Sequence, residues 1–508
     1  MRYPARSLTP PALVASLALP ALLALPALSG CVGGDPDMAP SDAETSADAV
    51  TALLPREGLA YLAGRALAER PELRELTVTV DRAAIRPEEG GTIIHGPSEG
   101  VIPIDSVRLE PDQEGAALIA TARLGPADLA VPILRRPKLG APEQCHLRMT
   151  SSGGLATVVL LPAATPGREL QAAGVAELDL QDVELLLDEG CPEPVPAHAA
   201  ELGATLRAAI AAAVARHLTE VAQVAASAAG PGQALTGGKR IGAGLLRATL
   251  APSGVGSTIR VRREGIARVY DAGVDARLEG DDAPCAPVPV GHLAPPAPSP
   301  SPPPLAPGGA AYRLALAIDG AFLDRALSWA AASGAACQDD GPEAGLSPDD
   351  VAKLPGVASI VTEGRPLRSR LRPAQGVRTS LRPDAAAPLR LTMRELGLAV
   401  YGEVDGAPLA FARLQATVDV DATVELTEAG DLVLSPVGVT VTDAVAKPTV
   451  LPEGVDGVLA AAESLYEAAI RTLLSRRPLP LQAWTDRPAE LVAVEATESH
   501  LMIYFDLR

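Results

Sequence analysis

The chain has 508 residues, of which 47% are hydrophobic but only 2% aromatic, and its formal net charge is −19. An acidic chain binds nucleic-acid phosphates and bare anionic lipid surfaces poorly. The scarcity of aromatic rings also argues against base stacking on single-stranded nucleic acid, so we expect no nucleic-acid partner. The length exceeds that of one ordinary hydrophobic core, which indicates two or more large domains.

The first 30 residues have the pattern of an export signal. Arg2 and Arg6 precede an apolar stretch over residues 11–28, and small residues follow it. The run Leu28-Ser29-Gly30-Cys31 resembles the lipobox of bacterial lipoproteins, in which the signal is cut before the Cys and that Cys is acylated. The alternative is an ordinary secretory signal cut elsewhere, with Cys31 incidental. We expect Cys31 to be the lipidation site.

Cleavage before Cys31 leaves 478 residues (508 minus 30) with a net charge of −21, because residues 1–30 hold two arginines and no acids. Several acyl chains on one residue give durable anchoring, where a single chain would be marginal. No later segment has eighteen uninterrupted apolar residues, so no further membrane span is expected. The expected location is the cell envelope, lipid-anchored, at the outer membrane and facing the periplasm or the surface.

Several elements are expected in the first part of the mature chain. Residues 31–55 are interpreted as a lipidated tether, since residues 32–48 are rich in Gly, Asp, Pro, Ala and Ser. A helix is predicted over residues 56–70, and an alternating strand over residues 76–80 follows it. Further strands are expected over 117–124, 155–161, 175–187, 245–250 and 257–261, and a long helix over 199–229.

A Pro-rich linker, residues 286–308, precedes a second series of elements. A strand over 312–318 ends at Asp319, which is placed to cap a helix over 321–336. The remaining predictions are strands over 414–426 and 437–441, a helix over 453–475, and closing strands over 491–496 and 500–507. Each half therefore reads helix, strands, long helix, strands, which indicates a duplicated domain at residues 56–285 and 309–508.

Four local patterns resemble the tubular lipid-binding superfamily, whose best-known member is bactericidal/permeability-increasing protein. They are Arg56-Glu-Gly-Leu-Ala-Tyr-Leu-Ala-Gly-Arg65 with Leu73-Arg-Glu-Leu76, Cys145 with Cys191, residues 314–337, and Leu474-Ser-Arg-Arg-Pro-Leu-Pro-Leu481 with residues 490–507. The resemblance implies an α+β fold of two tandem domains, each a curved antiparallel sheet wrapped around a long helix. It also implies lipid binding in an apolar pocket.

Two features depart from that family. Its endotoxin binders have a cationic first domain, whereas this chain is acidic. A second disulfide and a long Pro-rich linker are not carried over from it.

The residues expected to contact lipid lie on the apolar stripes of the predicted helices and on one strand: Leu59, Leu62, Leu206, Ile210, Leu218, Val418 and Val420. An aliphatic cavity with few polar groups suits acyl chains. Periodicity alone fits an ordinary dry core equally well, and only the resemblance favours the pocket.

Beyond Cys31 the chain has four cysteines, Cys145, Cys191, Cys285 and Cys337. An even count in an exported protein indicates two disulfides. Three pairings are possible, and we expect the neighbours along the chain, Cys145–Cys191 and Cys285–Cys337. A zinc site is the rival interpretation, but no ligand spacing supports it. We expect no metal and no cofactor.

One motif has the pattern found in hydrolases, but a turn is the preferred interpretation. Gly96-Pro97-Ser98-Glu99-Gly100 fits G-x-S-x-G, but a nucleophile elbow needs a helix directly after it and the sequence there is extended. Our main hypothesis is a membrane-anchored envelope lipoprotein that binds or shuttles acyl lipids and is not an enzyme. The alternatives are a structural or interaction lipoprotein with a filled core, and a hydrolase using Ser98.

Overall fold

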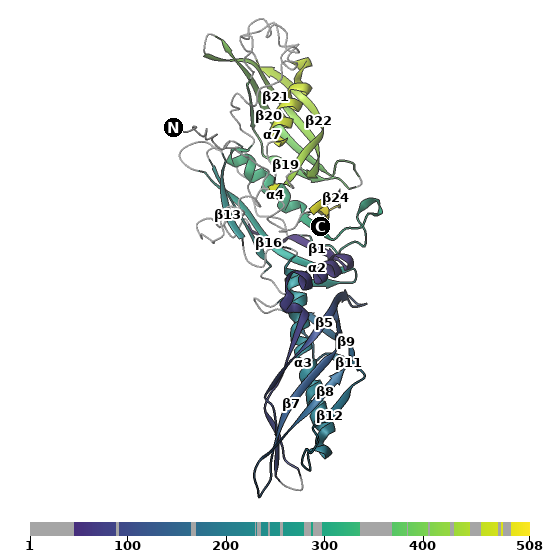
Figure 1. Ribbon diagram of the computed structural model, residues 1–508. Coiled ribbons are helices and arrows are strands. Elements are labelled where there is room, and N and C mark those ends of the chain that lie inside the picture. The colour runs from purple at the N-terminus through teal and green to yellow at the C-terminus, as the bar shows by residue number, and fades with distance from the viewer. Residues whose placement is uncertain are drawn as a thin grey trace, which may run out of the picture.

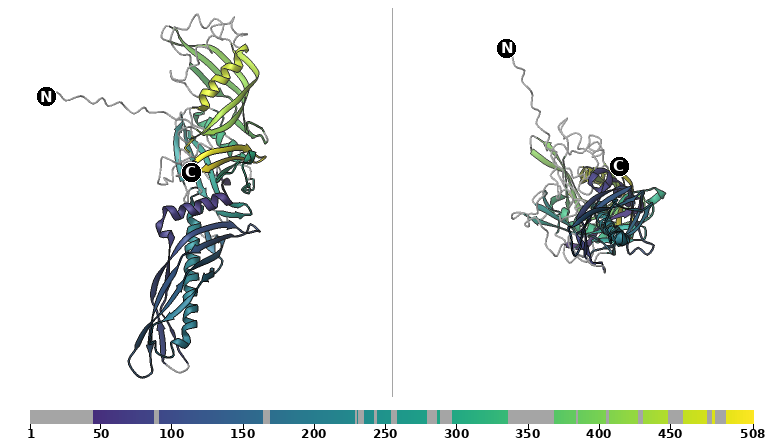
Figure 2. Two further views of the ribbon diagram at one scale, coloured as in Figure 1. Left: turned by 45° about the vertical axis from the view of Figure 1, so that its right-hand side comes forward. Right: turned by 60° about the horizontal axis from the view of Figure 1, so that its bottom comes forward.

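The protein is an elongated molecule with a sheet across its middle and one further sheet region toward each end (Figures 1 and 2). The computed structural model describes residues 45–87, 91–163, 169–228, 230, 235–241, 244–253, 258–278, 286–287, 297–335, 368–383, 385–404, 407–426, 431–447, 459–475, 479–480 and 489–508. In these residues 55% lie in strands and 23% in helices.

The expected fold class, two tandem domains that each wrap one sheet around a long helix, is wrong. In the described part of the chain the strands form four antiparallel sheets, and four α-helices accompany them. The largest sheet contains strands from both halves of the chain, so it belongs to neither expected domain alone. Hydrophobic alternation marks a strand but does not show which strand it pairs with, and this is why the pattern of elements gave the wrong architecture.

The central sheet has the order β13-β14-β16-β1-β17-β25-β24, with β15 paired to β16. The first half supplies β1 (Thr45–Pro55), β13 (Leu235–Ile241), β14 (Gly244–Pro252), β15 (Ile259–Arg262) and β16 (Gly265–Leu278). The second half supplies β17 (Leu314–Asp319), β24 (Ala489–Ala496) and β25 (His500–Leu507). The halves meet where β1 pairs antiparallel with β17, for example at Val50 and Ile318.

Two sheets lie in the rest of the first half. One has the order β10-β9-β6-β5-β2 with β11 beside β9; its strands are β2 (Glu75–Val80), β5 (Ser98–Pro111), β6 (Leu118–Leu124), β9 (Gly153–Pro162), β10 (Leu170–Ala172) and β11 (Glu177–Gln181). The other has the order β12-β8-β7-β4-β3, with strands β3 (Ala83–Ile85), β4 (Thr92–His95), β7 (Ala127–Arg136), β8 (Glu143–Ser151) and β12 (Glu184–Leu187).

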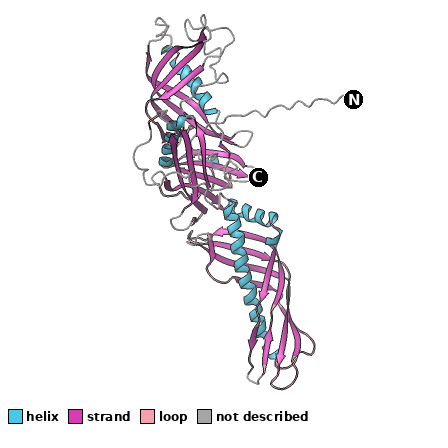
Figure 3. Ribbon diagram, turned by 90° about the vertical axis from the view of Figure 1, so that its left-hand side faces the viewer, coloured by secondary structure: helices cyan, strands magenta, loops and turns pink. Residues whose placement is uncertain are grey.

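Two helices pack on these first-half strands. Helix α2 (Arg56–Glu69) follows β1 without a break, and the short helix η3 (Pro71–Arg74) leads from it into β2. Helix α3 (Ala199–Ser227) runs along the sheets (Figure 3) and contacts strands of both, among them β2, β6, β8 and β9. The structure agrees with the predicted helices over 56–70 and 199–229 within two residues at each end, because apolar residues recur in both at spacings of three and four.

The second half has its own sheet, in the order β18-β20-β21-β22-β23 with β19 beside β20. Its strands are β18 (Arg368–Pro373), β19 (Val377–Leu381), β20 (Leu389–Val404), β21 (Ala407–Leu426), β22 (Asp431–Lys447) and β23 (Leu479–Pro480). Helix α4 (Gly320–Ala330) contacts β19, and helix α7 (Ala462–Ser475) contacts β22. Of the expected helix over 453–475, residues 453–458 lie outside the described residues.

Asp319 caps α4 as predicted. Its Oδ1 accepts a hydrogen bond from the Phe322 backbone N–H at 2.9 Å, and its Oδ2 accepts one from Ala297 N–H at 3.1 Å. One turn of π-helix (Ala331–Ala335) continues the helix, where an α-helix to residue 336 was expected. Within this turn Gly334 has a φ of 116°, a conformation that glycine adopts without strain.

Two segments expected to be connectors take part in the central sheet. Residues 45–55, predicted as the end of the tether, form β1, whose residues from Ala49 to Pro55 are all buried. The end of the Pro-rich segment lies against the sheet, where the Tyr312 hydroxyl donates to Pro303 O at 2.6 Å. The Arg260 side chain donates to Ser299 Oγ at 2.7 Å. Composition alone did not show that these segments are held by specific contacts.

Candidate lipid-contact core

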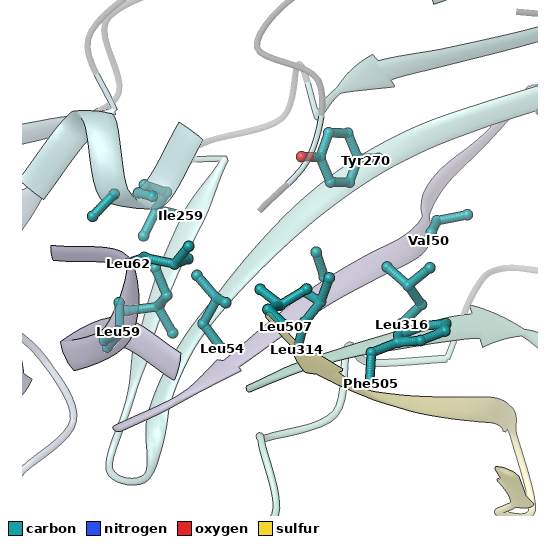
Figure 4. Close-up of a cluster of buried hydrophobic side chains, with 14 of the residues drawn as sticks. Val50, Leu54, Leu59, Leu62, Ile259, Tyr270, Leu314, Leu316, Phe505 and Leu507 are labelled. Carbon is teal, nitrogen blue, oxygen red and sulfur yellow. The ribbon is translucent and has the colours of Figure 1, made fainter. Parts of the chain in front are cut away.

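The α2 residues predicted to contact lipid lie at the junction of this helix with the central sheet. Leu59 and Leu62 are 0% and 1% exposed. Figure 4 shows them beside Leu54 of β1 and Ile259 of β15, among aliphatic side chains. The spacing of three residues places both on the buried side of the helix.

The α3 residues form the buried stripe of the long helix. Leu206, Ile210 and Leu218 are at most 1% exposed. Close packing begins near the N-terminal end, where a Cβ on Gly203 would lie 2.5 Å from Leu185 Cδ1. His217 is half-buried, and its Nε2 atom lies 2.9 Å from the carbonyl oxygen of Leu73. The stripe therefore faces sheet side chains over much of its length.

Val418 and Val420 lie on β21, in the sheet of the second half, and both are 0% exposed. Their polar neighbours point to the other face: Arg390 donates to Asp421 at 2.8 Å, and the Thr392 hydroxyl donates to Asp419 at 2.6 Å. The hydrogen bond from Arg390 holds the pKa of Asp421 below its ordinary value, with Arg382 adding to the effect. The alternation of apolar and polar residues in the sequence thus corresponds to the inner and outer faces of this sheet.

All seven predicted side chains belong to one continuous apolar cluster that extends through the molecule. Five of the seven lie on α2 and α3, and these two helices contact each other. Val418 and Val420 lie in the second-half sheet and form a separate region of the cluster. The cluster is built mainly from Leu, Val, Ile and Ala, as the 2% aromatic content requires.

A buried polar group beside the α3 terminus was not foreseen. Arg268 of β16 is 0% exposed, and its guanidinium donates to Glu169 Oε1 at 2.5 Å and to Gly230 O at 2.9 Å. Burial raises the pKa of the adjacent Tyr270 hydroxyl. The signal was present in the sequence, because Arg268 stands alone within the apolar run Gly265-Ile-Ala-Arg-Val-Tyr270.

The structure links Cys145 of β8 to Cys191, the residue eight positions before α3 begins, as predicted; their Cα atoms are 5.6 Å apart. This bridge connects a strand to the segment that leads into the long helix. Cys31, Cys285 and Cys337 lie outside the described residues.

Ser98 of the G-x-S-x-G motif is the first residue of β5, and its hydroxyl donates to Ala130 O at 2.6 Å. A strand thus follows where a nucleophile elbow has a helix. Among the described residues, no group of three or more His, Cys, Asp or Glu side chains could hold a metal ion. None of the helices in the described part of the chain is both long and apolar enough to cross a membrane.

Comparison with known proteins gives only structural likenesses. No protein-family profile matches the sequence, and no curated protein matches it. Among solved structures, the chain is similar to a lipopolysaccharide binding protein, with 13% identity, a TM-score of 0.39, and coverage of 91% of this chain and 99% of the other. It is also similar to P47 of Clostridium botulinum E1, with 6% identity, a TM-score of 0.25, and coverage of 91% and 100%.

Proposed function

We propose that the protein is a lipid-anchored lipoprotein of the cell envelope that holds acyl lipids within its apolar interior. The observation that carries the proposal is the cluster of aliphatic side chains shared by α2, α3 and the sheets. Aliphatic surfaces with few polar groups are the environment that acyl chains enter most favourably. The lipobox-like run ending at Cys31 supports a place beside a lipid source.

The proposed contact region is the place where α2 and α3 meet beside the first-half sheet that contains β2 and β5. Leu59 and Leu62 are among the buried residues of α2, and Ile210 and Leu218 are among the buried residues of α3. An acyl chain there would replace contacts between neighbouring aliphatic side chains. Contacts of a side chain with an acyl chain and with another aliphatic side chain differ little in energy, because both partners are apolar. The interior specifies no headgroup, so the proposal concerns acyl lipids as a class.

A structural or interaction lipoprotein with a filled core is the second candidate. The near-complete burial of all seven predicted side chains favours it. So does the tight fit of Gly58, where a Cβ would lie 2.0 Å from Arg313 O. The two candidates differ in one measurable property, since only a lipid carrier retains lipid after purification.

The test is native mass spectrometry and lipid extraction of the full chain carrying Cys31→Ser, purified without harsh detergent. That variant lacks the acylated residue, so any lipid found is bound and not covalent. Lipid at a fixed stoichiometry supports the carrier. A lipid-free protein of native stability, which also takes up no added phospholipid, would establish the filled core instead.

A further inference from the structure

A group of exposed apolar side chains lies on the outer face of the first-half sheet that contains β9. Along β9, Ala156, Val158 and Leu160 are buried, whereas the alternate side chains of Leu155, Val159 and Leu161 are 49%, 45% and 37% exposed. Ile119 of β6 lies opposite Val159 in register and is half-buried. We name the group Ile119, Leu155, Val159 and Leu161 the β9 patch.

Single exposed apolar residues are common on protein surfaces, but three members of the β9 patch are immediate neighbours. Val159 and Leu161 occupy successive outward positions on β9, and Ile119 faces Val159 on β6. Leu155 lies on the same face of the sheet, on the far side of Thr157. An antiparallel sheet with one solvated face normally places polar residues there. A contiguous exposed apolar patch with a charged border is typical of a protein interaction surface.

Charges of opposite sign flank the β9 patch at the level of Leu155. On the β11 side, Asp179 lies opposite Leu155 and Glu177 lies opposite Thr157. On the β6 side, Arg123 lies opposite Leu155. These three side chains are exposed, and within the described residues none of them forms an ion pair.

We propose that the β9 patch is the interface for a second copy of this chain, related by a two-fold axis that runs parallel to β9. Rotation by 180° about that axis turns one sheet face onto the other and exchanges the two borders. Asp179 of one copy then faces Arg123 of the other at the same level along the strand. An axis across the strands would instead place acid against acid, which disfavours that arrangement.

The size of this sheet face sets the expected strength of the dimer. The face is formed by β11, β9, β6 and β5; four strands about 4.8 Å apart and about seven residues long cover about 450 Å². Stable dimers usually bury about 800 Å² per partner, so this interface is expected to give a weak, reversible dimer. The two-fold symmetry requires each ion pair to occur twice, so each substitution acts at two places.

The test is sedimentation equilibrium of the full chain in a density-matched detergent. The wild type is expected to be in monomer–dimer equilibrium. Arg123→Asp and Asp179→Arg should each weaken dimerisation by about tenfold or more, since each places two like-charge pairs in the interface. The double variant Arg123→Asp with Asp179→Arg should restore it. Arg207→Asp, on the exposed side of α3, is the matched control and should dimerise like the wild type.

A wild type that stays monomeric throughout the accessible concentration range would overturn the proposal, and so would a double variant as weak as the single variants. Binding to vesicles of phosphatidylglycerol and phosphatidylethanolamine tests the alternative that the patch contacts a lipid surface. Loss of vesicle binding by Leu155→Asp, with self-association unchanged, would assign the patch to a lipid surface and reject the dimer. Thermal melts of every variant exclude misfolding as the cause.

Cross-linking tests the position of the axis. Val159 lies in the middle of the patch, so two Val159→Cys side chains should meet across the two-fold axis and join through a short bis-maleimide. Val437→Cys on β22, where the native side chain is 55% exposed, is the control and should give only the background of the wild-type cysteines. Equal yields from the two variants would reject the interface.

Discussion

At the scale of single residues, Arg268 connects three parts of the first half. Its guanidinium donates to the carbonyl oxygens of Ser227 and Gly230 at 3.1 and 2.9 Å, at the end of α3. The last carbonyls of a helix have no partner within it and carry partial negative charge, so a cation placed there is favourable. The ion pair with Glu169 links the segment before β10 to Arg268, and through it to the end of α3.

Removing this cation should destabilise the protein strongly. Arg268→Met leaves Glu169 without its partner in a site where that side chain is only 13% exposed, and such losses cost about 3–5 kcal/mol. Adding Glu169→Leu should recover much of the loss. Arg148→Met is the control, because its pair with Asp128 is 54% exposed on both sides and should cost at most about 1 kcal/mol. Chemical denaturation measures the unfolding free energy of all three variants. Equal losses of stability for Arg268→Met and Arg148→Met would refute the structural role of Arg268.

Two buried histidines should make stability depend on pH. Burial lowers the pKa of both His95 and His500 below the ordinary value of 6.5, with the acids Glu201 and Asp319 opposing the effect. The unfolded chain therefore binds more protons than the folded chain just below pH 6.5, and unfolding free energy should fall as pH decreases through that region. His500→Gln should reduce the slope between pH 5 and 7 in urea titrations, whereas an unchanged slope would contradict this assignment.

At the scale of elements, the sequence predicted the helices that have an apolar stripe or a capping residue. The helices at α2 and α3 follow from their apolar stripes, and the start of α4 follows from Asp319, whose carboxylate accepts the Phe322 N–H. The partition of strands among sheets could not be predicted in the same way. The strands expected over 175–187 divide into β11 and β12, which join different sheets. Pairing depends on neighbours distant in sequence, and alternation carries no information about them.

The disulfide belongs to this scale, because it joins β8 to the segment that precedes α3. Its two cysteines are 46 residues apart. Closing a loop of that size restricts the unfolded chain and stabilises the fold by about 2–4 kcal/mol. The double variant Cys145→Ser with Cys191→Ser should unfold at correspondingly lower denaturant concentration. A midpoint equal to that of the unreduced wild type would show that the bridge contributes nothing.

At the scale of the whole molecule, the two halves are joined through the central sheet and α2. Beside the β1–β17 pairing, the guanidinium of Arg313 lies 4.4 Å from the ring centre of Tyr61 on α2. Gly58 allows that helix to approach the Arg313 backbone, since a Cβ there would lie 2.0 Å from its carbonyl oxygen. The candidate contact residues on α2 therefore lie close to the place where the two halves of the chain meet. The duplicated pattern had assigned these halves to separate domains.

In the proposed function, anchoring is a property of the whole molecule and depends on acylation of Cys31. Cys31→Ser should release the protein from membranes or stop removal of its signal, because the acylated residue is lost. Ser29→Ala keeps a small residue before the cut and should fractionate with membranes like the wild type. Membrane fractionation with mass measurement of the mature N-terminus tests both. A Cys31→Ser protein that is processed normally and stays in the membrane fraction would refute the lipobox interpretation.

The central claim is that the aliphatic interior holds lipid, and bound lipid per protein in an Ile210→Trp variant tests it most directly. The larger ring should occupy space that an acyl chain would fill, so retained lipid should fall while the melting temperature changes little. Ala204→Trp, on the exposed side of the same helix, should retain lipid like the wild type. In a filled core, Ile210→Trp would overpack and cost about 1–3 kcal/mol. Unchanged lipid content together with that loss of stability would contradict the claim.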